Sequence, residues 1–481
     1  MSKFYITCAI PYVNSVPHLG HSLEFVQGDT IARYHRLLGD EVLLLSGGDE
    51  NALKNIQAAE YAGVPIQEFI DKNTQLFFDL TRALNCRFDI WQKGSDTTRH
   101  FVSSQKLWQL CDNAGDMYKK SYEGLYCVGC ETFYAPDELD PNGECFEHPG
   151  KKLEMISEEN YFFKLSRYQK QLIDRISSDQ LKIVPQTRKN EILSFLAQPL
   201  QDISISRSNA RAKNWGVPVP GDPSQRMYVW FDALNIYQSG IGFGWNEAQY
   251  AKWWPADLHV IGKGITRFHA VYWPAFLMSA KLPLPASLFV HGYLTVNGQK
   301  MSKSVGNVID PLDMIKKYGA ESLRYYLLRE IPSYGDGDFS ERRFKELYNA
   351  DLANGLGNLV ARVAKLASSG SGLKISQGLT LIQFKEINTG EYKKALEEYR
   401  FHDALAHVWE KIKITDKFID EKQPWTLKGD ALTDVLEIAI NNIREIATLL
   451  LPFLPETSEK ILTQFMRQSI QSMGPLFPRI A

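Results

Sequence analysis

The chain has 481 residues, of which 44% are hydrophobic and 23% are charged, and its formal net charge at pH 7 is −2. This length accommodates two to four domains with sizeable cores, and the composition is ordinary for a globular enzyme. No apolar run approaches the ~20 residues that span a bilayer, and the start MSKFYITCAIPYVN meets Pro and Asn too early for a secretory signal. We therefore expect a cytoplasmic protein without membrane contact, in which any nucleic-acid surface is a local patch.

The first 110 residues alternate strand-like and helix-like runs. Segments 4–10 and 41–45 are short and apolar, as in buried strands, whereas 19–38 and 67–84 carry apolar residues at helical spacing. This alternation predicts βαβ units and a parallel sheet, which binds nucleotides where strand ends meet helix starts. A Walker-type lysine loop is missing from the sequence, which disfavours kinase or GTPase chemistry of that kind.

A histidine pair lies between the first predicted strand and the first predicted helix, in Pro17-His18-Leu19-Gly20-His21. Pro17 suits a first helical turn, where its missing N–H has no partner to lose. His18 and His21 are three residues apart and so point to one face, beside unpaired amides and the positive end of the helix dipole. Such a place suits a polyphosphate, and Gly20 leaves the backbone bare for a flat base.

Two acidic residues, Asp49 and Glu50, follow the second predicted strand through Ser46-Gly47-Gly48. At the end of a strand they can hold a ribose hydroxyl or a substrate ammonium. They can equally cap the helix that is expected to start near Ala52. The residues alone leave both interpretations open.

Residues 115–225 interrupt the alternation and contain two turn-spaced ligand pairs. Cys127-Val128-Gly129-Cys130 is followed, after fourteen residues, by Cys145-Phe146-Glu147-His148. This spacing predicts a tetrahedral Cys₃His zinc site, and closed sites of this kind are structural rather than catalytic. The alternative is four unrelated reduced side chains. Cys8, Cys86 and Cys111 are expected to be small buried residues.

The pattern of strands and helices resumes near residue 226. Segment 257–262 is expected to be a strand, 267–280 its helix and 287–296 a further strand, and Asn297-Gly298 indicates a tight turn. The glycine cluster 240–244 is expected to be a loop. An apolar stripe of the kind that is more often core than ligand pocket is formed by Val229, Trp230, Ala233, Leu234 and Tyr237.

The loop after the turn carries Lys300-Met301-Ser302-Lys303-Ser304. Two lysines three residues apart, with hydroxyls and no acids, make a cationic clamp for a charged leaving group. Solvated surface lysines are the alternative, and the pentad alone does not exclude it.

The remaining chain is patterned as helices. A long helix is expected at 312–328, followed by helical segments at 344–367, 392–419, 432–451 and 455–466, which together predict an α-helical bundle. Trp425, in a helix-breaking loop after Pro424, is either a core anchor or a platform for a splayed base. Asn358 and Arg362 lie one helical turn apart and could read base edges.

The HLGH and KMSKS segments, in this order and at this separation, resemble the paired signatures of class I aminoacyl-tRNA synthetases. Segments 9–12 (AIPY), 228–233 (YVWFDA) and 268–274 (FHAVYWP) are similar to those of methionyl-tRNA synthetases. The resemblance covers essentially the whole chain. It implies an α/β fold with a Rossmann-type parallel-sheet catalytic domain in two halves (1–114 and 226–325). A connective insertion with a zinc knuckle (115–225), a linker that contacts the tRNA stem (326–345) and an all-α anticodon-binding domain (346–481) complete the expected organisation.

The resemblance also implies an activity and its catalytic residues. Methionine would be activated by ATP to methionyl-adenylate and pyrophosphate, and then transferred to the 3′-terminal adenosine of tRNA(Met). The catalytic residues would be His18, His21, Lys300 and Lys303, joined at the ATP site by Gly20 and Ser302, with Mg²⁺ accompanying the ATP. The L-methionine site would comprise Ala9, Ile10, Tyr12, Asp49, Val229, Trp230, Ala233, Leu234, Tyr237, Ile265 and His269, with Asp49 at the amino group.

Several further expectations follow from the same resemblance. Arg207 would lie near the substrate, whereas Asn51 and Gly264 depart from the family pattern, which often has an acidic residue at the position of Gly264. The short insertion leaves no room for a separate editing domain, and the chain end without an added β-barrel favours a monomer. One structural Zn²⁺ would be held by Cys127, Cys130, Cys145 and His148, and the anticodon by Asn358, Arg362 and Trp425.

Three alternatives to this interpretation can be separated by their sites. A leucyl or cysteinyl enzyme would keep both signatures but need another amino-acid pocket, and a cysteinyl enzyme would place zinc at that pocket. A nucleotidyltransferase of another kind would not need the helical half. A tRNA-binding or zinc-knuckle scaffold without activity is disfavoured because both signatures are intact.

Overall fold

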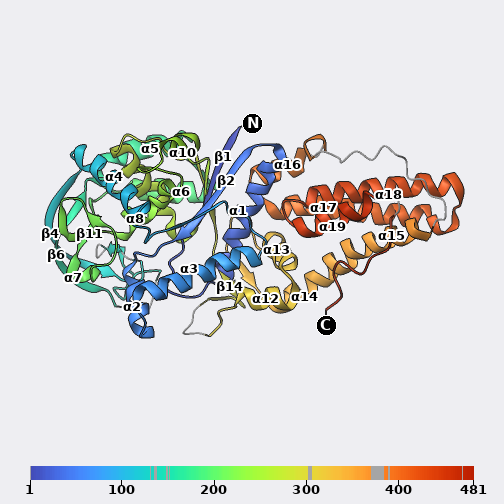
Figure 1. The fold of residues 1–481 in the computed structure, drawn as a ribbon, viewed down its shortest axis with the longest axis horizontal. Coiled ribbons are helices and arrows are strands. Elements are labelled where there is room, and N and C mark those ends of the chain that lie inside the picture. Colours follow the sequence, from blue (N-terminus) through green and yellow to red (C-terminus); the bar gives the residue numbers. More distant parts are fainter. Residues whose placement is uncertain are drawn as a thin grey trace.

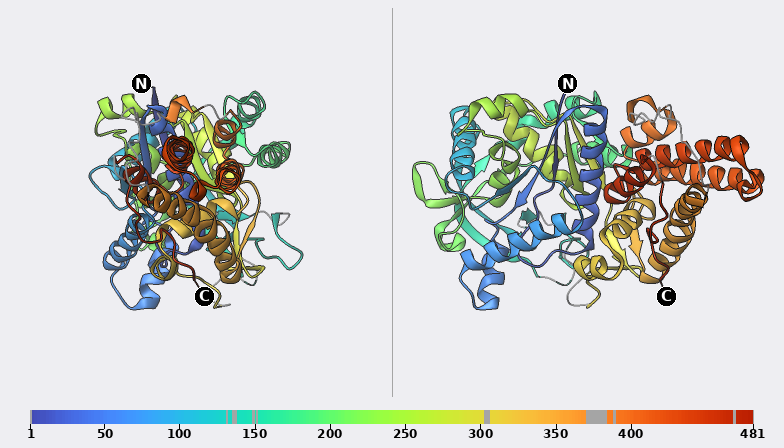
Figure 2. Two further views of the ribbon diagram at one scale, coloured as in Figure 1. Left: turned by 90° about the vertical axis from the view of Figure 1, so that its right-hand side faces the viewer. Right: turned by 45° about the vertical axis from the view of Figure 1, so that its right-hand side comes forward.

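The computed structural model describes residues 2–130, 132–134, 138–147, 150, 152–301, 306–369, 384–387, 390–467 and 470–480. A sheet with its covering helices occupies one side of the molecule, and a group of long helices projects from the other (Figure 1). The right-hand view in Figure 2 shows the same division, with the C-terminal helices leading away from the sheet, whereas the left-hand view looks along these helices. Among these residues, none of the helices has the length and apolar character that a membrane span requires.

A six-stranded sheet in the order β3-β2-β1-β12-β13-β7 forms the centre of the α/β region. All of its pairings are parallel, which confirms the predicted parallel-sheet fold. β2 and β3 extend the sheet on one side of β1, whereas β12, β13 and β7 extend it on the other, so the order reverses between β1 and β12. The strands are β1 (Lys3–Cys8), β2 (Glu41–Gly48), β3 (Ile90–Lys93), β7 (Lys182–Val184), β12 (Leu258–Gly262) and β13 (Ser287–His291).

Helix α1 (Leu19–Leu38) connects β1 to β2 and has the bounds predicted from its apolar spacing. It ends at Gly39 (φ 86°), where the left-handed conformation suits a residue without a side chain. Its Gly28 lies against the sheet, because a Cβ there would be 2.3 Å from the sulfur of Cys8. The neighbouring helices are α2 (Leu53–Ala62), α3 (Ile66–Ala83) and α4 (His100–Asn113).

The stretch 115–225 is built on a long antiparallel hairpin of β4 (Met117–Cys127) and β6 (Glu154–Phe163). The cysteine segment lies at the tip of this hairpin, since Cys127 ends β4. β7 also comes from this stretch but pairs with β13, so the central sheet takes one edge strand from it. The other elements are β5 (Thr132–Tyr134), α5 (Gln169–Ser177), α6 (Gln186–Leu196), β8 (Ile203–Ser204), β9 (Ser206–Ser208), α7 (Asn209–Ala212), β10 (Pro218–Val219) and β11 (Asp222–Met227).

Three elements that were expected to be continuous are divided. The strand expected at 287–296 is broken at Gly292, where a Cβ would lie 2.1 Å from the Gly335 carbonyl oxygen. The helix expected at 312–328 is two helices that meet at Gly319 (φ 86°), and the one expected at 267–280 begins with a π-helical turn. The resulting elements are β13, β14 (Leu294–Val296), the π-helical Phe268–Tyr272, α11 (Trp273–Ser279), α12 (Pro311–Tyr318) and α13 (Ala320–Arg329).

Short elements complete the α/β region. β14 pairs with β15 (Gln299–Lys300) on one side and with β16 (Gly337–Phe339) on the other. The predicted loop at 240–244 is a turn. Before β12 come α8 (Val229–Leu234), α9 (Ile236–Ser239) and α10 (Glu247–Trp253).

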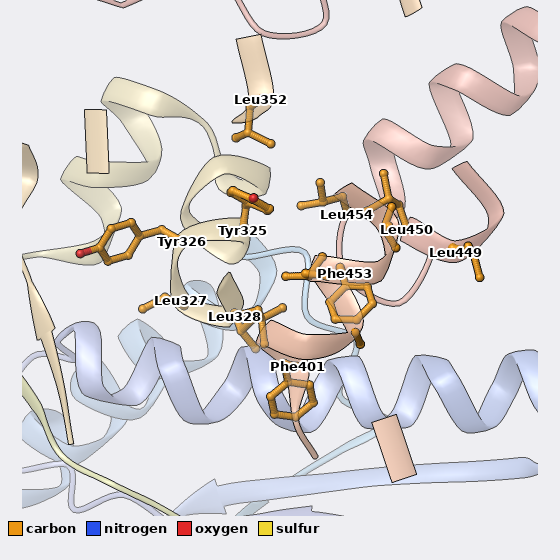
Figure 3. Packing of buried hydrophobic residues seen from close by; sticks show 14 of the residues in the cluster. Tyr325, Tyr326, Leu327, Leu328, Leu352, Phe401, Leu449, Leu450, Phe453 and Leu454 are labelled. Carbon is orange, nitrogen blue, oxygen red and sulfur yellow. The ribbon is translucent and has the colours of Figure 1, made fainter. Parts of the chain in front are cut away.

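The C-terminal region is helical, as predicted. Its hydrophobic core is continuous with the one beneath α1. Figure 3 shows this junction, where Tyr325 and Leu328 of α13 and Phe453 from the turn after α18 lie among the labelled core residues above α1. The helices are α14 (Glu341–Leu347), the π-helical Tyr348–Gly357, α15 (Asn358–Ser369), α16 (Gly390–Glu397), α17 (Phe401–Lys422), α18 (Gly429–Leu450) and α19 (Pro455–Phe465).

Candidate active site

The two predicted histidines form the N-terminal cap of α1, next to the point where the strand order reverses. The Gly20 N–H donates to His18 Nδ1 (3.1 Å), and the His18 N–H donates to His21 Nδ1 (3.1 Å). Because each Nδ1 accepts, the proton of each neutral ring is on Nε2. Burial lowers the pKa of His18 to about 4, and burial together with His18 and His291 lowers the pKa of His21 well below its usual value. Both rings therefore offer neutral Nε2–H donors at pH 7.

The lysine segment begins beside this histidine turn. A Cβ placed on Gly20 would lie 3.8 Å from Met301 Cε, so residues 20 and 301 lie next to each other. Ser302 and Lys303 lie outside the described residues, and the side chain of Lys300 is likewise not described. The convergence of the two segments is thus seen at Met301, whereas the contacts of the lysines stay a prediction.

A buried polar pair that the sequence analysis missed lies behind His21. His291, the last residue of β13, contacts Glu24 of α1 through Nε2 and Oε2 (3.0 Å) and the Gly292 carbonyl oxygen through Nδ1 (2.8 Å). Both ring nitrogens of His291 thus lie within hydrogen-bond distance of an oxygen atom. The sequence signal that could have revealed this pair was a glutamate, Glu24, among the apolar residues of the predicted helix, because a buried carboxylate needs a partner.

A cluster of aromatic side chains, which we call the aromatic pocket because it is the predicted methionine site, belongs to a different hydrophobic core from that of α1. Trp230 stacks on Phe268, with ring centroids 3.6 Å apart, and Tyr12 meets Trp230 edge-on at 6.0 Å. The Tyr237 hydroxyl donates to His269 Nε2 (2.7 Å), and His269 Nδ1 donates to a backbone carbonyl oxygen (3.0 Å). Burial lowers the pKa of His269 to about 4, so this dyad is neutral at pH 7. The walls suit an uncharged, polarizable side chain.

The other residues predicted to bind methionine come from the same region. His269 is 2% exposed and contributes the polar end of the pocket. One hydrophobic cluster contains Ala9, Val229, Trp230, Ala233, Leu234 and Tyr237, and Ile10, Tyr12 and Ile265 pack against it.

Asp49 does not cap a helix, so that interpretation is wrong. α2 begins after Ala52, which has no capping side chain. Asp49 is 3% exposed and forms a parallel bridge to Tyr12, with its N–H donating to the Pro11 carbonyl oxygen (2.9 Å). The structure therefore places Asp49 between the second strand and the aromatic pocket.

Asn51, which departs from the family pattern, contacts Arg207, which was predicted to lie near the substrate. Arg207 is 1% exposed, and its Nη2 donates to the Asn51 carbonyl oxygen (3.0 Å). The Asn51 amide donates to Asp232 Oδ2 (2.6 Å) in α8. Asn51 thus joins the segment after β2 to the helix that carries Trp230.

Three cysteine sulfurs gather at the tip of the β4–β6 hairpin. The Sγ atoms of Cys127, Cys130 and Cys145 all lie within 4.8 Å of one another, with Cys127 and Cys130 at 3.2 and 3.7 Å from Cys145. A tetrahedral zinc with bonds of about 2.3 Å places its sulfurs about 3.8 Å apart, so this group can hold a metal ion. His148, the predicted fourth ligand, lies outside the described residues. As predicted, Cys8, Cys86 and Cys111 are buried free thiols.

The cysteine loop touches the aromatic pocket. The Trp230 indole N–H donates to the Cys130 carbonyl oxygen (3.1 Å), and Lys54 Nζ donates to the Gly129 carbonyl oxygen (3.2 Å). Lys54 Nζ also lies 2.9 Å from the ring centroid of Tyr12. A cavity of about 1070 Å³ between the hairpin and the sheet region borders Trp230.

The predicted anticodon residues lie on the helical region. Trp425, in the 3₁₀ turn Pro424–Thr426, is 54% exposed, so the core-anchor interpretation is wrong. The Arg362 guanidinium lies 5.3 Å from the Trp425 ring centroid and pairs with Asp416 (3.0 Å) and Asp420 (2.5 Å). Asn358, at the start of α15, is exposed. Arg362 and Trp425 therefore share one surface.

A doubly wound sheet with a histidine pair at the first helix, a cysteine hairpin between its halves and a helical region after it defines a class I tRNA synthetase. The sequence profile described as tRNA synthetases class I (M) matches residues 4–364. The chain belongs to the methionyl family of class I tRNA synthetases.

Individual relatives agree with this assignment over nearly the whole of this chain. The methionine–tRNA ligase of Thermotoga maritima is 41% identical over 496 residues, which cover 99% of this chain and 78% of the relative. That of Brucella suis is 39% identical over 472 residues, covering 96% and 91%. Among solved structures, Mycobacterium tuberculosis methionyl-tRNA synthetase in complex with methionyl-adenylate superposes with a TM-score of 0.91 at 36% identity, covering 100% of this chain and 99% of that one.

Proposed function

We propose that this protein is a methionine–tRNA ligase, which activates methionine with ATP and transfers it to tRNA(Met). One combination of features carries the proposal. Two neutral histidine donors lie at the start of α1, and the aromatic pocket contains a neutral Tyr237–His269 pair. Phosphate binding requires the first, and recognition of an uncharged thioether requires the second.

In the first step, the methionine carboxylate attacks the α-phosphorus of ATP in line. A carboxylate oxygen–phosphorus bond forms while the bond from the α-phosphorus to the pyrophosphate oxygen breaks, and the bond electrons leave with pyrophosphate. The substrate itself is the nucleophile, so the protein acts by positioning and charge stabilisation. His18 and His21 donate from Nε2 to phosphate oxygens, and Lys300 and Lys303 neutralise the leaving pyrophosphate together with the Mg²⁺ that accompanies ATP.

Methionine specificity is assigned to the aromatic pocket. Tyr12, Trp230 and Ile265 contact the thioether, and Asp49 receives the substrate ammonium beside Tyr12. Apolar contacts discriminate weakly against a substrate that lacks one methyl group, by about 10- to 200-fold. Homocysteine should therefore be activated, but less efficiently than methionine.

In the second step, a ribose hydroxyl of the 3′-terminal adenosine of tRNA attacks the carbonyl carbon of the adenylate, and AMP leaves. Trp425 would stack on an anticodon base, and Arg362 and Asn358 would contact base edges. Cys127, Cys130 and Cys145, with His148, would hold a zinc ion that stabilises the hairpin tip. That the enzyme is a cytoplasmic monomer stays a prediction, which light scattering and cell fractionation test.

Amino-acid-dependent ATP–pyrophosphate exchange tests the proposal. We expect exchange with methionine, weaker exchange with homocysteine, and none above background with leucine or cysteine. Exchange driven by leucine or cysteine, or equal rates with homocysteine and methionine, would refute the assignment of the pocket.

Substitution of the histidine turn tests the catalytic roles in the same assay. His21→Ala should lower the exchange rate by about a hundredfold or more, because a transition-state donor is lost, while methionine affinity is nearly unchanged. Lys303→Ala should act in the same way. His407→Ala, at an exposed histidine of α17, is the matched control and should leave the rate unchanged. Loss of methionine affinity with a normal exchange rate would contradict these roles.

A further inference from the structure

Lys54 stands at a place in its helix where a lysine does not favour the helix itself. It is the second residue of α2, so its positive charge meets the positive end of the helix dipole. The first turn, residues 53–56, has no acidic residue in its sequence, and the residue before it is Ala52, whose methyl group cannot cap a helix. The reason for a lysine at this position therefore lies in what its ammonium group contacts outside α2.

The ammonium group of Lys54 joins two segments that are far apart in the sequence. Its Nζ lies 2.9 Å from the ring centroid of Tyr12, in the loop between β1 and α1. The same Nζ donates to the Gly129 carbonyl oxygen (3.2 Å), in the turn that follows Cys127. A cation over an aromatic ring is attracted by the negative charge density of the ring face. Lys54 thus fastens one face of the Tyr12 ring to the cysteine loop.

Trp230 contacts the same loop at the next residue. Its indole N–H donates to the Cys130 carbonyl oxygen (3.1 Å), so two successive carbonyl groups of the loop accept from two residues at the aromatic pocket. The rings of Tyr12 and Trp230 meet edge-on, with their centroids 6.0 Å apart. The contacts therefore form a closed circuit, which we call the Tyr12 clamp: it runs from Tyr12 through Lys54, Gly129, Cys130 and Trp230 back to Tyr12.

Tyr12 itself lies on a loop, so the contacts of its ring decide how the ring is oriented. Its main chain forms an isolated parallel bridge to Asp49 rather than a strand. A side chain that closes a binding site is held precisely only when its neighbours fix it in one orientation. Within the clamp, Trp230 meets Tyr12 edge-on and the Lys54 ammonium lies over its face. Lys54 is thus the charged member of the set that orients the Tyr12 ring.

We propose that Lys54 is a positioning residue for methionine binding, which acts by holding the Tyr12 ring against the aromatic pocket. The inference rests on the proposed function, because methionine is the ligand assigned to this pocket. A ring that is already oriented needs no ordering when the ligand binds, and the binding free energy is more favourable by that saved entropy. Loss of the Lys54 charge should therefore weaken methionine binding, while the affinity for ATP and the rate of the chemical step stay the same.

Removing the charge while keeping most of the side-chain length tests the proposal. In ATP–pyrophosphate exchange, Lys54→Met should raise the KM for methionine by about three- to tenfold, as one cation–ring contact supplies, with the KM for ATP and kcat unchanged. The Kd for methionine without ATP, measured by calorimetry, should rise by the same factor. Lys54→Arg keeps a cation and a donor and should recover part of the lost affinity.

A purely structural role of Lys54 predicts a different pattern. A lysine that only joins α2 to the cysteine loop would lower the urea midpoint when it is replaced, and would leave the KM for methionine unchanged. The positioning role predicts a midpoint that changes little, because the lost contacts and the relieved repulsion with the helix dipole oppose each other. A lower midpoint in Lys54→Met together with an unchanged KM for methionine overturns the proposal.

A double-mutant cycle shows whether Lys54 acts through the ring of Tyr12. The factor by which Lys54→Met raises the KM for methionine is measured in the Tyr12→Phe background, which keeps an aromatic ring, and in the Tyr12→Leu background, which lacks one. The factor should persist with Tyr12→Phe and fall to nearly one with Tyr12→Leu. An equal factor in both backgrounds contradicts an action through the ring and overturns the proposal.

Lys252→Met is the matched control, because Lys252 is another lysine beside an aromatic ring. Its Nζ lies 5.0 Å from the ring centroid of Trp253, and it pairs with Glu41 at the start of β2. Its replacement should leave the KM for methionine unchanged. An increase equal to that in Lys54→Met would show that the loss of any such lysine weakens methionine binding, which overturns a specific role of Lys54.

The two levels of inference fail in different ways. A parent enzyme with no methionine-dependent exchange refutes the proposed function. Normal exchange by the parent, together with an unchanged KM for methionine in Lys54→Met, refutes only the role of Lys54.

Discussion

The hairpin that carries the cysteines and the C-terminal helical region are both attached to the central α/β region, but by different chemistry. The hairpin tip is joined by polar contacts that are partly exposed, such as Glu138–Arg267 (2.8 Å), whose side chains are 33% and 30% exposed. The helical region is joined by Arg324 of α13, which is fully buried with Asp29 of α1 (2.8 Å). Arg324 Nε also donates to the Phe453 carbonyl oxygen (2.8 Å) in the turn after α18.

Because of this difference, we expect the two joints to affect different properties of the protein, namely its stability and its substrate binding. A buried charge that loses its partner is costly, whereas an exposed pair contributes little. The contacts of the hairpin include those with Trp230 and Lys54, which lie at the aromatic pocket. We therefore expect damage to the helical joint to lower the free energy of unfolding, and damage to the hairpin joint to change substrate affinity at nearly constant stability.

Removal of Arg324 should give the largest effect. Arg324→Met leaves Asp29 buried without its main partner and should lower the free energy of unfolding by about 3–5 kcal/mol in urea titrations. Arg343→Met, which breaks an exposed pair with Glu330, should cost at most about 1 kcal/mol. The double variant Asp29→Asn, Arg324→Met should be less destabilised than the sum of the single changes. Equal losses in the two single arginine variants would remove the distinction between the joints.

Acid should destabilise the substrate pocket before it affects the helical joint. Burial lowers the pKa of His269 to about 4, below the usual value of about 6.5 that applies in the unfolded chain. Between these values the unfolded state binds more protons, so the free energy of unfolding falls as the pH drops from 6.5 towards 4 and is unaffected above 6.5.

For His269 this loss should amount to about 2 kcal/mol between pH 7 and pH 5. The measurement compares urea unfolding of the parent and of His269→Gln at both values, because the difference isolates one group from the other titrating side chains. His269→Gln should lose less stability on acidification than the parent. An identical loss in both proteins would show that His269 is not neutral and buried in the native state.

The outer surface of the helical region should affect tRNA binding alone. Trp425→Ala should weaken tRNA binding by about tenfold if its exposed ring stacks on one base, and should leave methionine-dependent exchange and the urea midpoint unchanged. Ile438→Ala is the control, because it removes another exposed apolar side chain and should not change tRNA binding. Trp409→Ala would not serve, because Trp409 is buried. Unaltered tRNA affinity in Trp425→Ala would refute the stacking role.

The sequence predicted what depends on local spacing. Helix 19–38, the histidine turn and the cysteine group all follow from residues a few positions apart, and the structure has them where they were expected. The break at Gly292 was missed because its cause is the close approach of Gly335, which lies far away in the chain. The Glu24–His291 pair was missed for the same reason, since it joins residues that meet only after the strands are ordered.

The smallest effect should come from the contact between the hairpin and the aromatic pocket. Trp230→Phe keeps an aromatic ring against Phe268 but removes the N–H that donates to the Cys130 carbonyl oxygen. One such bond contributes about 0.5–1.5 kcal/mol, so the KM for methionine should rise about three- to tenfold while the urea midpoint changes little. Trp254→Phe removes an equivalent indole contact, to the Pro283 carbonyl oxygen (2.9 Å), and should leave the KM for methionine unchanged. If both variants raised the KM for methionine equally, the cause would be a general loss of stability, and the contact between the hairpin and the pocket would have no effect of its own.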